Sequence, residues 1–141
     1  MQRSRILAAG VLAGVATLVS ALPAAAFETA YGHTASGNRT LHHGCHSYRY
    51  HYVVKPGSDD WLFETRLYDP DGEQLGTSDF APGSDPADGY AYFHVCSQTT
   101  HPGRFTIRAR LDWYVAPSTP LGQPEEHSVW FEPTHFKLTR P

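Results

Sequence analysis

Apolar and polar side chains alternate with a period of two along much of this chain. In "RFTIRARLDWYV" (104–115) every second position from Phe105 to Val115 is apolar, and the positions between them are mostly polar. "WLFETRLY" (61–68) alternates in the same way, with Glu64 and Arg66 on its polar side. This period predicts strands with one buried and one wet face, as an antiparallel sheet allows.

Turn-forming residues separate these segments. "YDPDG" (68–72) predicts a tight turn in which Pro70 fixes φ and Gly72 adopts a positive φ. Pro133 is expected to bend the last strand or to place it at a sheet edge. Further strands are expected near residues 28–34, 42–54, 90–96 and 127–139. About seven short strands in one small domain predict an all-β fold, a two-sheet antiparallel β-sandwich.

The first 26 residues follow a different pattern. Arg3 and Arg5 precede an apolar run that ends in three small residues, the last of them Ala26. A basic start, an apolar centre and a small-residue cleavage site indicate a secretory signal peptide. The run is shorter than the ~20 residues of a membrane-spanning helix, and Pro23 interrupts it. We therefore expect residues 27–141 to form one secreted domain without a membrane span.

Charge and cysteine content narrow the class of protein. Without Arg3 and Arg5 the chain has nine basic and fourteen acidic residues, which argues against nucleic acid or an anionic membrane as a partner. Cys45 and Cys96 are the only cysteines, and an exported domain meets an oxidising environment, so they are expected to form a disulfide. If several of the nine histidines are buried in neutral form, the fold should weaken between about pH 6.5 and 5.

The segment "HHGCHSYRYHYVV" (42–54) has two possible orientations in a sandwich. Tyr48, Tyr50 and Tyr52 lie on one side of the strand, whereas Cys45 lies on the side of the polar residues. If the tyrosines are buried, the disulfide lies on the outer face or near a sheet end. If instead the disulfide is buried between the sheets, the tyrosines form an exposed stripe that can stack on sugar rings.

The second orientation must also bury Arg49 and His51, which costs several kcal/mol unless both are paired. We therefore favour buried tyrosines, either in a regular strand or with a bulge at Gly44 that brings Cys45 to the tyrosine side. The polar side of the two cysteine-bearing strands then becomes the best candidate binding surface. Its expected ligand-binding residues are Arg49, His51, Tyr90, Tyr92 and His94.

The three tryptophans divide into two groups. Trp61 and Trp113 alternate with other apolar residues, so we assign both to the core. Trp130 precedes Phe131, and neighbouring side chains of a strand point to opposite faces, so one of this pair should be exposed or lie at a sheet edge. Trp130 therefore joins the candidate contact residues.

"LYDPDGEQLG" (67–76) and "HPGRFTIRARL" (101–111) resemble a pattern of bacterial immunoglobulin-like and related secreted β-sandwich domains. In those domains a strand ends in D-P-x-G, and a later strand begins with P-G and an aromatic residue. The resemblance covers residues 61–113 and implies an immunoglobulin-like fold but no particular activity. Cys45, Trp61 and Cys96 also follow the Cys…Trp…Cys order of immunoglobulin domains, although His94 stands where those domains have tyrosine.

Metal binding and catalysis are the alternatives to organic ligand binding. His42, His43 and His46 suggest zinc or copper, but neighbouring histidines on a strand point apart. Acidic residues in "DPDGE" (69–73) could bind calcium, although an Asp-rich turn explains them without a metal. No nucleophile motif such as G-x-S-x-G is present, and both cysteines are assigned to a disulfide, so a small secreted hydrolase is a third possibility only.

These observations predict a small extracellular binding or interaction module without catalytic activity or cofactor. Its ligand is expected to be a glycan or a protein, and the domain to be a monomer or a weak oligomer. An extracellular protein that binds calcium, zinc or copper is the alternative.

Overall fold

The computed structural model describes residues 27–141, so the expected signal peptide lies outside the described residues. They contain a short 3-10 helix, η1 (Thr29–Tyr31), followed by strands only. None of the described residues belongs to a helix long and apolar enough to cross a membrane. The strands are β1 (Gly32–Ala35), β2 (Arg39–Thr40), β3 (Cys45–Val54), β4 (Trp61–Tyr68), β5 (Gln74–Phe80), β6 (Asp88–Cys96), β7 (Gly103–Val115), β8 (Glu125–Trp130) and β9 (Thr134–Thr139).

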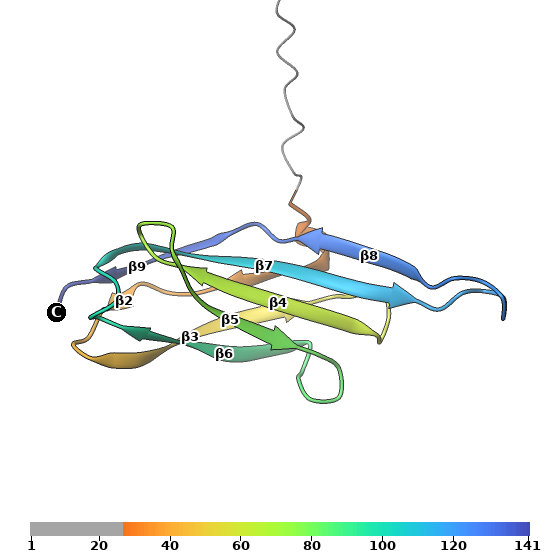
Figure 1. Cartoon of the computed structure of the whole chain (residues 1–141), viewed down its shortest axis with the longest axis horizontal. Helices are drawn as coiled ribbons and strands as arrows, with labels where there is room; N and C mark the ends of the chain where they lie inside the picture. Colours follow the sequence, from red (N-terminus) through yellow and green to blue (C-terminus); the bar gives the residue numbers. More distant parts are fainter. Residues whose placement is uncertain (1–26) are drawn as a thin grey trace, which may run out of the picture.

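These strands form two sheets, which confirms the expected all-β fold. Sheet A has the order β1-β3-β6, and sheet B has the order β2-β9-β7-β4-β5, with β8 also paired to β7. Figure 1 shows β3 and β6 in a layer beneath β4 and β7. The strand pairs are antiparallel except for β2 and β9, which run parallel and depart from the expected pattern.

The core lies between the two sheets and contains the tyrosines of β3. Tyr48, Tyr50 and Tyr52 are all buried. Tyr50 stacks on Phe93 of β6, and Tyr52 contacts Phe63 of β4 with ring centroids 5.5 Å apart. The favoured orientation of β3 is therefore confirmed. The β3–β6 register runs without a shift from Cys45–Cys96 to Val53–Asp88, so the strand is regular and has no bulge at Gly44.

The predicted turn after β4 forms as expected. Gly72 has a φ of 85°, the conformation that glycine adopts at no steric cost. The Asp69 carboxylate accepts hydrogen bonds from the backbone N–H groups of Asp71 and Glu73, both at 2.9 Å. Its second oxygen accepts a 3.0 Å hydrogen bond from the Thr100 hydroxyl. A buried aspartate thus holds the turn against the segment that leads into β7.

The first and last expected strands differ from the prediction. Residues 29–31 are helical rather than extended, and the first strand begins only at Gly32. The expected strand 127–139 is divided at Pro133 into β8 and β9, because proline cannot donate a ladder hydrogen bond. This division and the two-residue β2 explain why nine strands form where about seven were expected.

Trp130 and Phe131, which are adjacent at the end of β8, point to opposite sides of the sheet. Phe131 is buried, whereas Trp130 is 37% exposed, so one residue of the pair is exposed as expected. Trp61 and Trp113 are buried, which confirms their assignment to the core. They are paired on the neighbouring strands β4 and β7. The hairpin of β7 and β8 extends beyond the rest of the molecule as an arm (Figure 1). Leu121 at its tip is 96% exposed.

The disulfide between Cys45 and Cys96 is present, as expected. It joins directly opposed residues of the neighbouring strands β3 and β6. The backbone N–H of Ser97 donates to the Gly44 carbonyl, so the two cysteines form a non-hydrogen-bonded pair, in which side chains lie closest. The bridge therefore lies within sheet A, not between the sheets as in immunoglobulin domains. The chain therefore has the Cys…Trp…Cys order of immunoglobulin domains without their disulfide between the two sheets.

Candidate functional site

The outward side of sheet A brings together most of the residues that the sequence singled out. Alternate residues of β3 and β6 point away from the core, because the intervening residues are buried. Antiparallel pairing places Arg49 opposite Tyr92 and His51 opposite Tyr90. We call this surface the A face, made up of Ser47, Arg49, His51, Tyr90, Tyr92 and His94.

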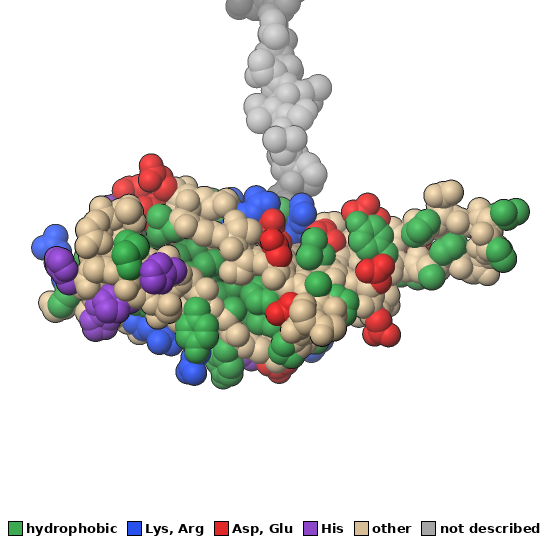
Figure 2. Space-filling model, turned by 60° about the horizontal axis from the view of Figure 1, so that its bottom comes forward, with side chains coloured by type: hydrophobic (Ala, Val, Ile, Leu, Met, Phe, Trp, Pro, Cys, Tyr) green, Lys and Arg blue, Asp and Glu red, His purple; other side chains and the backbone are tan. Residues whose placement is uncertain are grey.

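Two tyrosines project from the A face into solvent. Tyr90 is 61% exposed and Tyr92 is 58% exposed, in contrast to the buried tyrosines of β3. Both follow the same strand with one residue between them, so their Cα atoms lie about 7 Å apart. Figure 2 turns this side of the molecule toward the viewer and shows hydrophobic, histidine and basic side chains next to one another there.

Tyr90 is held in place by its neighbours. The Arg49 guanidinium carbon lies 4.6 Å from the centroid of the Tyr90 ring, within the range of a cation–π interaction. The His51 ring lies 4.9 Å from the same ring, centroid to centroid. His51 Nε2 is 2.7 Å from Asp88 Oδ1, which fixes the imidazole from the other side. Arg49 and His51 therefore both contact the exposed ring of Tyr90.

A shallow depression of about 230 Å³ borders this cluster. One wall is the connection between β1 and β2, and the other consists of Arg49, His51 and Tyr90. The Ser36 hydroxyl in that connection lies 3.5 Å from the Arg49 carbonyl oxygen. The depression provides hydrogen-bonding groups beside the exposed rings and is too shallow to enclose a ligand.

His94 lies at the disulfide end of the A face. It is opposite Ser47 in the strand register, and the Ser47 hydroxyl is 3.4 Å from His94 Nδ1. Ligand atoms of Cys45, His94 and Cys96 lie within 4.8 Å of one another. The two sulfur atoms are bonded to each other, however, and metals bind thiolates. In the oxidised protein this cluster offers His94 as its one free metal-binding group.

Trp130 is not part of the A face. It belongs to β8 of sheet B, opposite Arg110 of β7, and the Arg110 guanidinium carbon lies 5.7 Å from its ring centroid. Local alternation indicated that one residue of the Trp130–Phe131 pair is exposed, and the structure shows that it is Trp130. Which sheet it joins depends on long-range strand pairing, which the sequence pattern does not report.

The acidic turn at residues 69–73, a possible calcium site in the sequence, directs the carboxylates of Asp69 and Asp71 toward other groups of the same chain. Asp69 accepts three hydrogen bonds from the chain, and Asp71 Oδ2 lies 2.8 Å from His101 Nε2. Burial alone would raise the pKa of Asp69, but its hydrogen bonds from Glu73, Thr100 and Asp71 outweigh this effect and lower the pKa. These contacts give the turn its shape without a bound ion.

A second concave surface lies on the outward side of sheet B, and the sequence pattern did not predict it. A groove of about 490 Å³ runs between the turn at residues 68–72 and the start of β9, over the polar side of β7. The alternation in the sequence did predict that the arginines of β7 lie on a solvent-exposed strand face. The groove forms because β9 places His135 opposite Thr106, a pairing between segments 29 residues apart.

Comparison with known proteins adds no relative: no family model, no curated protein and no solved structure matches this chain.

Proposed function

We propose that this protein is a secreted binding module that recognises a glycan through the A face. The observation that carries the proposal is the pair of exposed tyrosines, Tyr90 and Tyr92, on a face that is otherwise polar. Exposed aromatic rings offer large contact area at a low conformational cost. Arg49, His51 and His94 surround the rings with hydrogen-bonding groups of the kind that sugar hydroxyls need.

A glycan fits this surface better than a second protein. Tyr90 and Tyr92 project from the A face into solvent, and the depression at its border holds only about 230 Å³. A protein partner is normally anchored by a central side chain that fills a well-packed pocket. A chain of sugar rings instead lies along a flat surface and needs ring faces with polar groups beside them. Protein recognition by the same face remains the alternative that the experiment below addresses.

The contacts of two histidines support the choice of binding over catalysis in this proposal. His94 pairs with Ser47, but among residues 27–141 no carboxylate lies within 4 Å of the His94 ring nitrogens to complete a triad. His101 directs one ring nitrogen to Asp71 and the other to the Pro102 carbonyl, and so has no nucleophile to activate. These contacts favour structural histidines.

Secretion and an immunoglobulin-like arrangement belong to the same proposal. The Cys45–Cys96 disulfide and the expected signal peptide at 1–26 support export. The strand order supports the fold resemblance, with β1-β3-β6 packed against β9-β7-β4-β5. The position of the disulfide within sheet A distinguishes this domain from antibody domains.

The test is a glycan array followed by calorimetry. We expect the oxidised protein to bind a subset of glycans, and Tyr90→Ala combined with Tyr92→Ala to weaken binding by about tenfold or more. Tyr114→Ala is the matched control, because Tyr114 is also exposed but lies on β7 of sheet B. Unchanged affinity in the Tyr90 and Tyr92 variant would disprove the role of the A face.

Tryptophan fluorescence is a poor readout for this experiment. Trp61 and Trp113 are buried, and Trp130 belongs to the other sheet. Chemical shifts of the Tyr90 and Tyr92 backbone amides report the A face directly. If no glycan binds but an extracellular protein shifts these same signals, the A face is the binding site and its ligand is a protein rather than a glycan.

A further inference from the structure

Basic side chains concentrate on the outward side of sheet B. After residue 26 the chain has nine lysines and arginines, and five of them lie on this side, although acidic residues outnumber basic ones overall. They alternate with buried neighbours on β4, β7 and β9, so they all point away from the core. These five are Arg66, Arg104, Arg108, Arg110 and Lys137.

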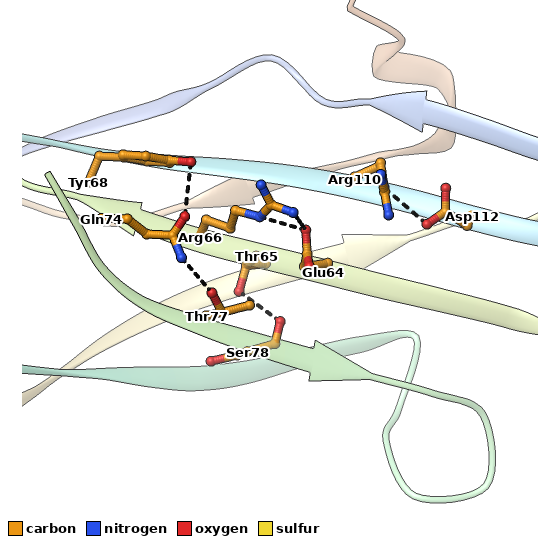
Figure 3. Close-up of polar contacts among 9 residues, drawn as sticks. All are labelled: Glu64, Thr65, Arg66, Tyr68, Gln74, Thr77, Ser78, Arg110 and Asp112. Atoms are coloured by element: carbon orange, nitrogen blue, oxygen red, sulfur yellow. Dashed lines mark hydrogen bonds and ion pairs between the residues drawn. The ribbon is translucent and has the colours of Figure 1, made fainter. Parts of the chain in front are cut away.

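Two of these arginines are neutralised by carboxylates on their own strands. Arg66 donates to Glu64 Oε1 through Nε at 2.7 Å and Nη2 at 2.6 Å. Arg110 Nε donates to Asp112 Oδ2 at 3.1 Å. Figure 3 shows both pairs, with Tyr68 donating a hydrogen bond to Gln74 beside them.

Arg104 and Arg108 are different. Within residues 27–141 neither guanidinium has a carboxylate oxygen within 4 Å. Arg108 lies directly opposite Arg66 in the β4–β7 register, but the carboxylate of Glu64 is engaged by Arg66. Arg104 and Arg108 are therefore the basic groups on this side of β7 whose guanidinium groups are not engaged by a neighbouring carboxylate among residues 27–141.

The two arginines line the groove of about 490 Å³ identified above. Thr106 lies between them on the same side of β7, and its hydroxyl is 3.0 Å from His135 Nδ1. The Arg108 guanidinium carbon is 5.0 Å from the Tyr68 ring centroid, so the aromatic ring supports this side chain at the groove wall. Hydroxyl, imidazole and two guanidinium groups thus line one concave surface.

The acidic residues at the edge of the groove are already engaged. Asp69 accepts hydrogen bonds from two backbone N–H groups and from Thr100. Asp71 pairs with His101. Their carboxylates are therefore committed to the turn, and neither is paired with a groove arginine.

We propose that this groove binds an oxyanion, namely a carboxylate, phosphate or sulfate group of a ligand. Arg104 and Arg108 supply the positive charge and the guanidinium donors, which match the geometry of oxyanions. Thr106 and His135 supply further hydrogen-bonding groups between the arginines. The site is separate from the A face because it belongs to the outward side of the other sheet, and it does not depend on the proposed glycan binding.

His135 provides an internal reporter of the site. Burial lowers the pKa of His135, and the positive charge of Arg104 lowers it further, whereas Glu132 acts in the opposite direction. An anion bound between Arg104 and His135 offsets the repulsion from the arginine. Ligand binding should therefore raise the pKa of His135 toward its ordinary value.

The experiment is an NMR titration of the disulfide-bonded protein with sodium phosphate, sodium sulfate and sodium glucuronate. Ionic strength is held constant with sodium chloride, because exposed charges are screened by salt. We expect saturable shifts of the Thr106, Arg108 and His135 amides. Saturation by phosphate and sulfate alone identifies a tetrahedral anion as the ligand group, and saturation by glucuronate alone identifies a carboxylate.

Two charge-matched variants decide the result. Arg104→Gln with Arg108→Gln should weaken binding by about tenfold or more, since charge-assisted hydrogen bonds to both groups are lost. Lys55→Gln with Arg140→Gln removes the same charge from exposed positions outside the groove and should leave binding unchanged. Equal weakening in both variants, or shifts that chloride reproduces, would overturn the proposal and indicate only general attraction of anions.

Discussion

The Tyr50 hydroxyl and the Thr65 hydroxyl form a 2.7 Å hydrogen bond across the buried space between the two sheets. Tyr50 belongs to β3 of sheet A, and Thr65 belongs to β4 of sheet B. Burial raises the pKa of Tyr50, which keeps its phenol neutral and able to donate. The bond requires the observed orientation of β3, because reversing that strand would expose Tyr50 and leave Thr65 without this partner.

A double-mutant cycle tests this contact. Tyr50→Phe and Thr65→Val each remove one hydroxyl and leave the other buried without its main partner, so each should cost about 1–2 kcal/mol of unfolding free energy. The double variant should cost less than the sum of the two, because no unpaired group remains. Urea denaturation measures all four proteins. Strict additivity would show that the two hydroxyl groups do not interact in solution.

The disulfide gives a second prediction about stability. Cys45 and Cys96 are 51 residues apart in the sequence, so the bridge closes a long loop in the unfolded chain. The chain-entropy model gives about 4 kcal/mol for a loop of this size. Cys45→Ser with Cys96→Ser should lower the unfolding free energy by that order in urea denaturation. A loss below about 1 kcal/mol would mean that the neighbouring strands already constrain the loop in the unfolded chain.

A third prediction concerns Arg49, which we infer positions Tyr90 for the proposed glycan. Arg49→Gln removes the cation from the Tyr90 ring, 4.6 Å from its centroid, and keeps a polar side chain. Affinity for an array-identified glycan should fall several-fold by calorimetry, because a cation–π contact is worth about 0.5–1 kcal/mol at exposed sites. Trp130→Ala should leave the affinity unchanged, since Trp130 belongs to sheet B. A larger loss in the Trp130 variant than in the Arg49 variant would move the site away from the A face.

The orientation of β3 and β6 could be predicted because it depends on local pattern and on one energetic argument. Side-chain alternation divides each strand into two faces, and burying Arg49 with His51 is more costly than burying the tyrosines. Both considerations act within a single strand or between two strands linked by the expected disulfide. For the same reason Tyr90, Tyr92 and His94 could be placed together on one side.

The remaining features depend on which strands pair across the fold. Alternation placed Trp130 and Phe131 on opposite faces, yet the sheet that Trp130 joins is decided by the pairing of β8 with β7. The groove on sheet B requires β9 to lie beside β7, which brings His135 to Thr106. The break at Pro133 makes this possible, since it separates β8 from β9 and lets each pair with a different part of β7. Alternation carries no information about these partners.

Two histidines should make opposite contributions to the pH dependence of the unfolding free energy. His101 has a raised pKa because of its backbone hydrogen bond to Pro102 and its contact with Asp71. A raised pKa in the folded state means that His101 stabilises the fold fully below its ordinary value of 6.5, and that this contribution disappears as pH rises through the folded pKa. His135, whose pKa is lowered by burial and by Arg104, acts in the opposite direction and weakens the fold as pH falls below 6.5.

These opposed effects are separable by variants. His101→Gln should remove the loss of stability above pH 6.5, and His135→Gln should remove the loss below it, in thermal melts from pH 5 to 8. NMR titration of the two imidazoles should place the pKa of His101 above that of His135. The reverse order would contradict the contacts of His101 with Asp71 and of His135 with Arg104. Asp69 adds a separate acid limit: its lowered pKa stabilises the fold above about pH 3.8, and this contribution is lost as pH falls further through its folded value.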